Sequence, residues 1–390
     1  MDKNALSHEE LARYSRHLII PEFNIEGQRR LKQSRVLVVG AGGLGSPLLQ
    51  YLAAAGVGKI GIIDPDVVDE SNLQRQVLYG QSSVGLPKVE EARTRIEDIN
   101  PYIEVETYQD ILTSDNALQI IDEYDIVADG TDNFPTRYLV NDACVLLGKV
   151  NVYASIFQFE GQVSVFNYLD KEGNRGPNYR DLFPTPPPPG MVPSCAEGGV
   201  LGVLPGIIGS MQALEVIKLA SGVGKPLSGR MLLFDALSFT TRILKLSRNP
   251  ENPLNGEEPT QTGLIDYEQF CGVPVMGDAP IDASGITEIT VQEFEELKKS
   301  GKDFQLIDVR EVHEYEIVNL GGELIPKGEI PKHLDRIARN KAVIVHCKGG
   351  ARSAKVVKML ESKYGFTQIC NLKGGLLAYI EEIDSSLPKY

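Results

Sequence analysis

The sequence has 390 residues, of which 42% are hydrophobic and 24% charged, a composition typical of a folded globular protein with two or three domains. Its formal net charge of -14 argues against direct nucleic-acid binding, because such proteins need Lys and Arg to neutralise phosphates. No apolar run is long enough to span a bilayer and the first ten residues are polar and acidic, so we expect a cytoplasmic protein without membrane contact.

Strands and helices are expected to alternate in the first part of the chain. The β-branched run from Arg35 to Gly40 predicts a buried parallel strand, and a glycine-rich turn separates it from a helix over Pro47 to Ala55. Further strands are expected at Lys59 to Asp64, Ile103 to Tyr108 and Ile126 to Ala128. This alternation predicts an α/β fold with a doubly wound, Rossmann-like sheet.

The character of the sequence changes after Val150. A strand is expected at Val163 to Tyr168, and an apolar-faced helix at Leu204 to Ala220. Between them, Thr185 to Gly190 (TPPPPG) predicts an exposed loop, because proline lacks the amide donor that a helix or central strand requires.

A second change marks the end of the first domain. Ser247 to Gly263 is rich in Pro, Asn, Gly and Glu and is typical of a linker. We therefore predict a first domain over residues 1–250, a linker over 251–283 and a smaller α/β domain over 284–390. The smaller domain is expected to have strands at Phe304 to Asp308 and Ala342 to His346, and a helical run over Ala354 to Leu360.

The turn after the first strand has the spacing of a nucleotide-binding loop. Gly40, Gly42 and Gly45 lie between a predicted strand and a predicted helix, where backbone amides can receive a phosphate. Asp64 ends the next strand, where an acid can hold a ribose hydroxyl. These features alone favour NAD or FAD as the nucleotide.

An ordered set of charged residues changes this preference to ATP. Asp66, Arg75, Lys88 and Asp132 follow the carboxyl ends of predicted parallel strands, where such folds bind ligands. Dehydrogenases need no such set, whereas cleavage of ATP needs cations for the polyphosphate and an acid for Mg²⁺. The sequence has no P-loop motif, so a different class of ATP-using enzyme is expected.

The strings GAGGLGSPLLQYLAAAGVGKIGIID, SNLQRQ, GLPKVE and DGTDN resemble the MoeB/ThiF family over about Leu11 to Arg248. Members are relatives of ubiquitin-activating enzymes that adenylate the C-terminal glycine of a small ubiquitin-like sulfur carrier. The resemblance implies ATP and Mg²⁺ as cofactors, with Asp132 at the metal. It also implies a homodimer in which Arg16 reaches the neighbouring subunit's site. Together with the motifs, it predicts the nucleotide-binding residues Gly40, Gly42, Gly43, Gly45, Asp64, Asp66, Ser71, Asn72, Leu73, Gln74, Arg75, Gln76, Lys88, Asp132 and Asn133.

Many members of this family hold zinc through two Cys-x-x-Cys pairs, and this sequence departs from that pattern. The positions of the first pair are Asn178 and Asp181, and those of the second are Asn252 and Asn255. Because all four thiols are absent, we expect no zinc, as in the rhodanese-bearing, MoeZ-like members.

The five cysteines are isolated from one another in the sequence. Cys195, in the segment PSCAEGG, matches a family cysteine that accepts the activated acyl group or resolves an acyl disulfide. Its Pro- and Gly-rich surroundings favour an accessible thiol. Cys144 and Cys370 lie in apolar runs and are expected in the core, and Cys271 is given no role.

A second candidate site follows the strand that ends at His346. A cysteine followed by a glycine-rich loop and a helix faces backbone amides that stabilise an anion such as a persulfide. Four residues separate Cys347 from Arg352, one fewer than in tyrosine phosphatases. The loop comprises Cys347, Lys348, Gly349, Gly350, Ala351, Arg352 and Ser353.

This loop, with DVRE from Asp308 and GGLLA from Gly374, resembles the rhodanese family over about Ile286 to Pro388. The resemblance implies that Cys347 carries the sulfane sulfur, and that Asp308 and Arg310 shape the site rather than react.

The two resemblances together imply one cycle. The first domain adenylates a sulfur carrier ending in Gly-Gly, and Cys347 takes sulfur from thiosulfate or a cysteine desulfurase. The persulfide then converts the carrier to a thiocarboxylate, with Arg16, Arg75, Lys88, Asp132, Cys195 and Cys347 as the catalytic residues. Such carriers serve molybdopterin, thiamine, cysteine or thiolated tRNA synthesis.

Three alternatives stay open: an NAD- or FAD-dependent oxidoreductase with a rhodanese domain, an activator of ubiquitin-like proteins whose rhodanese domain only docks partners, and a non-catalytic scaffold.

Overall fold

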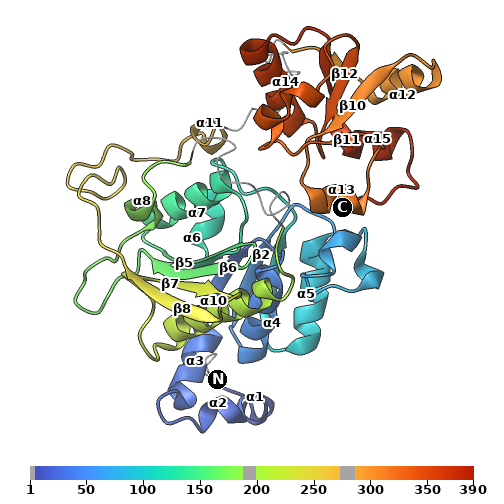
Figure 1. Cartoon of the computed structure of the whole chain (residues 1–390). Coiled ribbons are helices and arrows are strands. Elements are labelled where there is room, and N and C mark those ends of the chain that lie inside the picture. The colour runs from blue at the N-terminus through green and yellow to red at the C-terminus, as the bar shows by residue number, and fades with distance from the viewer. Residues whose placement is uncertain (1–4, 188–198, 273–285) are drawn as a thin grey trace. The chain divides into compact units, whose positions relative to one another are not determined.

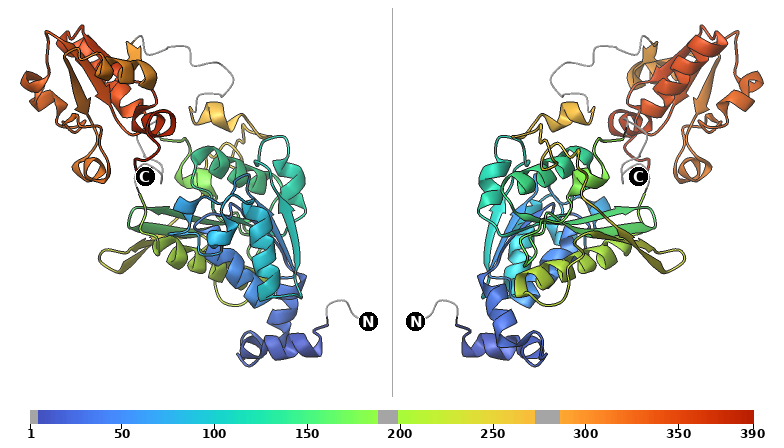
Figure 2. Two further views of the ribbon diagram at one scale, coloured as in Figure 1. Left: turned by 90° about the vertical axis from the view of Figure 1, so that its right-hand side faces the viewer. Right: turned by 90° about the vertical axis from the view of Figure 1, so that its left-hand side faces the viewer.

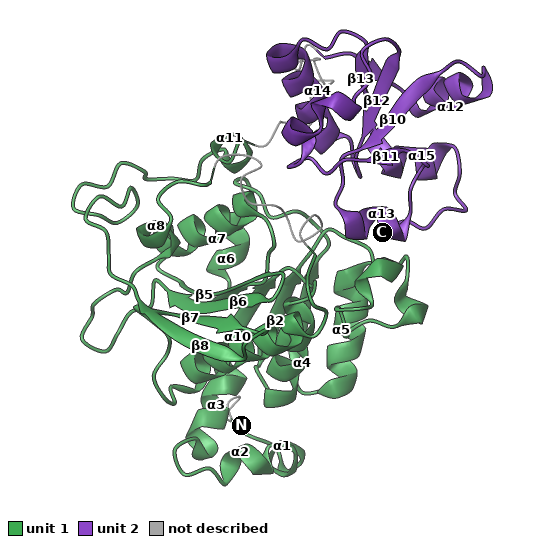
Figure 3. Cartoon of the chain, viewed as in Figure 1, with its two compact units in different colours: residues 1–275 green, residues 276–390 purple. Residues whose placement is uncertain are grey.

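A computed structural model of the chain describes residues 5–187, 199–272 and 286–390. The chain divides into two compact units, Met1–Val275 and Met276–Tyr390, which are treated separately below (Figure 3). Within the described ranges, no helix is both long and apolar enough to cross a membrane.

The first unit is built on an eight-stranded sheet in the order β3-β2-β1-β4-β5-β6-β7-β8 (Figure 1). The strands are β1 (Arg35–Val39), β2 (Lys59–Ile63), β3 (Glu104–Tyr108), β4 (Ile126–Asp129), β5 (Val150–Phe157), β6 (Glu160–Phe166), β7 (Arg230–Asp235) and β8 (Thr240–Lys245). The pairs from β3 to β5 are parallel, and those from β5 to β8 are antiparallel. The chain order reverses between β1 and β4, which is where doubly wound sheets bind ligands.

Helices cover both faces of this sheet (Figure 2). Val36 and Val38 of β1 face a core formed with α3, α4, α5 and α10, whereas Leu37 and Val39 face a second core formed with α6 and α7. Such alternation is what a central strand buried on both sides requires. The helices are α1 (His8–Arg13), α2 (Ser15–Leu18), α3 (Asn24–Gln33), α4 (Gly45–Ala55), α5 (Lys88–Ile99), α6 (Ala117–Asp122), α7 (Phe134–Leu146), α8 (Tyr179–Leu182), α10 (Leu204–Ser221) and α11 (Tyr267–Phe270), with 3-10 turns η1 (Glu70–Asn72) and η2 (Gln81–Ser83).

The second unit has a five-stranded parallel sheet in the order β11-β10-β12-β13-β9. Its strands are β9 (Glu288–Ile289), β10 (Phe304–Asp308), β11 (Glu323–Leu324), β12 (Ala342–His346) and β13 (Ile369–Leu372). The helices are α12 (Val291–Lys299), α13 (Val312–Ile317), α14 (Ala351–Tyr364) and α15 (Gly375–Glu382), with η3 (Ile330–Lys332) and η4 (Leu334–Arg336).

The predicted α/β architecture is confirmed. The helix after Cys347 begins at Ala351 and includes the run predicted over Ala354 to Leu360, and Gly350, with φ +89°, is its N-cap. Residues within the predicted linker also pack on the first unit, where Tyr267 and Leu254 are buried.

Candidate functional sites

The glycine turn is fixed at the carboxyl edge of the first sheet. Gly40 follows β1 with φ +93°, and a Cβ atom there would lie 3.2 Å from the carbonyl oxygen of Gly130, which follows β4. A Cβ atom on Gly45 would collide with the carbonyl oxygen of Gly40. Both positions therefore need glycine, and the turn leads directly into the N-terminus of α4, where backbone amides attract phosphate.

Asp64 lies beside this turn and organises it. One carboxylate oxygen accepts the Ala41 amide at 2.8 Å and the other accepts the Asp66 amide at 2.9 Å. Burial raises the pKa of Asp64, although nearby Lys88 opposes that shift. Tyr79 donates to the Ala41 carbonyl at 2.8 Å, a contact that the sequence motifs did not indicate. Asp64 thus directly follows β2 and lies beside the glycine turn, and its role as a ribose-binding acid stays a prediction.

Lys88 brings a buried positive charge to the same edge. It begins α5, directly after Pro87, and its side chain is only 6% exposed. Its ammonium lies 2.7 Å from the Asp66 carboxylate, and its amide donates to the Asp66 carbonyl at 3.0 Å. The cation is therefore held next to Asp64 and the glycine turn, where a polyphosphate would need it.

The segment from Ser71 to Gln76 forms the other wall of the turn. Arg75 donates to the Ser71 carbonyl at 3.0 Å, and its side chain lies 3.8 Å from a Cβ atom built on Gly43. Gln76 is buried and lies beside Gly42, and its Oε1 has no hydrogen-bond partner among the described residues. Gln74 contacts Gly202 rather than the glycine turn, and Leu73 packs against the hydrophobic core.

Asp132 and Asn133 have different surroundings. Both follow β4 and are exposed, close to the contact between Gly40 and Gly130. Asn133 uses its side-chain oxygen to cap α7 by accepting the Thr136 amide at 2.9 Å. The carboxylate of Asp132 makes no such helix cap and is the group of this pair suited to hold a cation.

Arg16 is a predicted catalytic residue of the first unit that the fold does not bring to this edge. It is exposed on α2, in the group of N-terminal helices at one end of the first unit (Figure 2). α2 packs near the carboxyl end of α4, since His17 Nδ1 lies 3.1 Å from Gln28, which donates to the Ala55 carbonyl at 2.8 Å. The glycine turn is at the other end of α4, about 16 Å away for eleven residues.

The residues at the zinc-ligand positions contact one another through hydrogen bonds. The side-chain amide of Asn178 donates to Asn255 Oδ1 at 3.0 Å. The side-chain amide of Asn252 donates to Asp181 Oδ1 at 2.7 Å and to Asn178 Oδ1 at 3.3 Å. Asn178 and Asn252 are fully buried. The described part of the chain contains no cluster of three His, Cys, Asp or Glu side chains suited to a metal ion.

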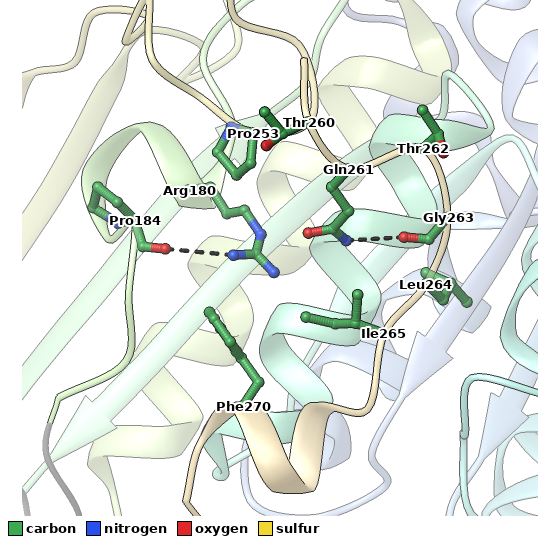
Figure 4. Close-up of a pocket in the computed structure, with 10 residues that line it drawn as sticks. All are labelled: Arg180, Pro184, Pro253, Thr260, Gln261, Thr262, Gly263, Leu264, Ile265 and Phe270. Atoms are coloured by element: carbon green, nitrogen blue, oxygen red, sulfur yellow. Dashed lines mark hydrogen bonds between the residues drawn. The ribbon is translucent and has the colours of Figure 1, made fainter.

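A buried ion pair lies close to this polar cluster. Arg180 donates to the Asp142 carboxylate at 2.7 Å, and Tyr267 donates to the same carboxylate at 2.8 Å. The guanidinium stands over the rings of Tyr138 and Phe270 and faces a shallow pocket lined in part by residues 260–265 (Figure 4). These contacts attach the segment that follows β8 to the body of the first unit.

In the second unit, Cys347 lies at the junction of β12 and α14. Its Sγ accepts the Gly350 amide at 3.2 Å and the Ser353 hydroxyl at 3.3 Å, and the residue is 1% exposed. The carbonyls of Cys347 and Lys348 accept the amides of Leu376 and Leu377 at 2.9 and 3.0 Å. Backbone amides of the GGLLA segment therefore hold the loop in place. The sulfur of Cys347 faces hydrogen-bond donors that stabilise an anion.

The charged residues around this loop form ion pairs. Arg352 donates to both carboxylate oxygens of Glu314, at 2.6 and 2.7 Å. Asp308 and Arg310 form a fully buried pair with Nε–Oδ distances of 2.9 and 3.0 Å, and Arg310 also donates to the Val318 carbonyl at 2.8 Å. Neither Glu314 nor its role was indicated by the motifs.

Of the remaining cysteines, Cys144 is fully buried and Cys271 is 8% exposed, and burial raises the pKa of both thiols. Cys370 is half-buried in β13. Cys195 lies outside the described residues, so its predicted role stays a prediction.

Two known families match the chain. The sequence pattern of the ThiF family matches residues 14–254, and that of the rhodanese-like domain matches residues 290–382. The chain is 50% identical over 390 residues to the probable adenylyltransferase/sulfurtransferase MoeZ of Mycobacterium tuberculosis, covering 99% of this chain and 97% of that protein.

Two further relatives cover different parts of the chain. The sulfur carrier protein adenylyltransferase of Thermus thermophilus is 57% identical over 68% of this chain and 98% of its own length. The adenylyltransferase and sulfurtransferase MOCS3 of Aedes aegypti is 45% identical over 99% of this chain and 90% of its own. The crystal structure of Escherichia coli MccB with ATP shares the fold, with a TM-score of 0.53 and 22% identity over 63% of this chain and 73% of that one.

Proposed function

Because the chain belongs to the ThiF family and carries a rhodanese-like domain, we propose that its two units act in one sequence of reactions on a small sulfur carrier protein. The chain is an adenylyltransferase and a sulfurtransferase, and relatives covering 99% of it carry both activities in their names. The first unit adenylates the C-terminal glycine of a ubiquitin-like carrier ending in Gly-Gly. The second unit supplies the sulfur that makes the thiocarboxylate.

The observation that carries the adenylation step is the placement of buried Lys88 beside Asp64 and the glycine turn. In that step a carboxylate oxygen of the carrier attacks the α-phosphorus of ATP. The bond to the β-phosphate breaks, and pyrophosphate leaves with the electron pair. Lys88 and Arg75 offset the negative charge that develops, and the amides of the glycine turn hold phosphate oxygens. The exposed carboxylate of Asp132 would hold Mg²⁺, which neutralises charge on the polyphosphate.

The sulfur step uses the loop of Cys347. The terminal sulfur of the Cys347 persulfide attacks the acyl carbon of the carrier adenylate, and AMP leaves. The resulting acyl disulfide is resolved when a second thiol attacks the Cys347 sulfur, which releases the thiocarboxylate and leaves a disulfide in the enzyme. Cys195 is the thiol proposed for this resolution, or for an earlier acyl transfer.

The test is intact-protein mass spectrometry of a Gly-Gly-ending carrier incubated with the full chain, Mg-ATP and either thiosulfate or a persulfidated cysteine desulfurase. The carrier is expected to gain the mass of sulfur replacing oxygen with the wild-type chain. It should not do so with Cys347→Ala, whereas Cys370→Ala in the same unit serves as the matched control.

The alternatives give different results in this experiment. If Cys347→Ala still forms thiocarboxylate, the second unit only docks partners. If the chain releases no pyrophosphate from ATP when the carrier is present, the adenylation proposal is wrong. A bound flavin or nicotinamide should then be sought by absorbance.

A further inference from the structure

The arginine of the persulfide loop is engaged by a carboxylate. Arg352, in the first turn of α14, is 35% exposed, and both of its terminal nitrogens contact Glu314, which is 12% exposed. Although burial alone would raise the pKa of Glu314, hydrogen bonds from Arg352 and from the Glu311 amide lower it to about 2. Glu314 therefore carries a full negative charge at any physiological pH and neutralises Arg352.

Tyr390 links Arg310 and Lys348 to this ion pair. Its hydroxyl accepts Arg310 Nη1 at 2.5 Å and donates to Glu314 Oε1 at 3.3 Å. Its ring lies 4.6 Å from the ammonium of Lys348, the residue directly after Cys347. One aromatic side chain thus contacts three charged residues of the loop's surroundings, through contacts that no motif in the sequence indicates.

These contacts bear on which sulfur donor the loop accepts. In transfer from thiosulfate, the Cys347 thiolate attacks the outer sulfur, the bond between the two sulfurs of thiosulfate breaks, and sulfite leaves with the electron pair. Thiosulfate enters as a dianion and sulfite leaves as a dianion, so this donor is held best by a cation with unoccupied donors. Around Cys347, which is itself 1% exposed, the donors of Arg352 already point at a carboxylate.

We propose that Glu314 and Tyr390 are specificity-determining residues of the sulfur-transfer reaction, which withhold Arg352 and Lys348 from small oxyanion donors. This inference rests on the proposed role of Cys347 as the sulfur acceptor. A donor that delivers sulfur without a sulfonate, such as a persulfide, does not need these cations and is not penalised by the clamp of Glu314 and Tyr390.

The test is steady-state transfer of sulfur from thiosulfate to cyanide by the full chain, comparing wild type with Glu314→Gln, Tyr390→Phe and Tyr390→Ala. Glu314→Gln keeps the shape of the side chain but removes its charge, and it is expected to lower KM for thiosulfate about tenfold with a smaller change in kcat. The gain should shrink at high salt, because screening weakens the attraction of the dianion. Tyr390→Phe should lower KM less than Glu314→Gln does. The KM of Tyr390→Ala should lie between the values for Glu314→Gln and Tyr390→Phe.

Glu316→Gln is the matched control, because Glu316 is an exposed carboxylate on the same helix, α13. An unchanged or higher KM in Glu314→Gln and in both Tyr390 variants would overturn the inference. Persulfide formation on Cys347 from a persulfide donor separates the two proposals. If the wild-type chain forms it, the proposed role of Cys347 stands whatever the variants do; if no donor produces it, that role fails and the inference fails with it.

Discussion

His346, the residue directly before Cys347, is a fully buried imidazole. It is 0% exposed, and neither ring nitrogen has a partner among the described residues. Its Nε2 lies 3.6 Å from Asp308, which is already paired with Arg310. Burial lowers the pKa of His346 to about 4, although Asp308 opposes that shift. The folded second unit therefore keeps this imidazole neutral well below the pH at which an unfolded chain would protonate it.

The stability of the second unit should consequently fall as the pH is lowered. Between an unfolded pKa near 6.5 and the folded value, the unfolded state binds one more proton, so unfolding becomes easier by up to about 3 kcal/mol. Hydrogen exchange of peptides from β10 and β12, corrected for intrinsic exchange, measures this effect. His346→Leu should flatten the pH dependence, and the exposed His313→Leu should leave it as in wild type. Equal slopes in all three chains would show that His346 does not titrate as inferred.

Among single residues, sequence motifs identified those whose proposed roles follow from local spacing, such as Gly40, Gly45 and Cys347. They did not identify Tyr79 or Tyr390. Tyr390 meets Arg310 and Glu314 across 80 and 76 residues of sequence, and Tyr79 meets Ala41 across 38. Such contacts depend on how elements pack, which a single sequence does not encode in a local pattern.

Among the elements, strands buried on both faces were predictable, because β1, β2 and β4 read as continuous apolar runs. The edge strand β8 was not predicted, and all six of its residues are exposed. An edge strand held mainly by backbone pairing to β7 leaves little hydrophobic pattern. The segment after β8 also has little hydrophobic pattern. It was therefore predicted to be a linker, although Tyr267 is buried against the first unit.

That segment is held to α8 by the polar cluster of Asn178, Asp181, Asn252 and Asn255. Because these side chains already satisfy one another, we expect a chelator such as EDTA to leave the melting temperature of the chain unchanged. Asn252→Ala should lower the free energy of unfolding by about 1 to 3 kcal/mol, because buried Asn178 and partly buried Asp181 each lose a hydrogen-bond donor. The measurement is urea denaturation, with the exposed Asn174→Ala as control. A melting temperature that falls with EDTA would mean that a metal stabilises this region.

For the whole molecule, the position of Arg16 is the main constraint on assembly. In its own chain it lies at the carboxyl end of α4, opposite the glycine turn. The side chain could therefore serve a nucleotide site only if a second copy of the chain supplied it, as in the homodimer that the family resemblance implies. A closed two-fold dimer would give each site one Lys88 from its own chain and one Arg16 from the partner.

This arrangement predicts complementation between two inactive variants. Arg16→Ala and Lys88→Ala should each reduce carrier-dependent release of pyrophosphate by about 100-fold or more, as expected for loss of a charge that stabilises the transition state. When the two variants are co-expressed with different tags and purified through both, each mixed dimer has one site with both residues intact and one site with neither. Such dimers should recover about half of the wild-type activity. If Arg16 acted in its own chain, every site of the mixed dimer would lack one residue, and the activity would stay at the level of the single variants.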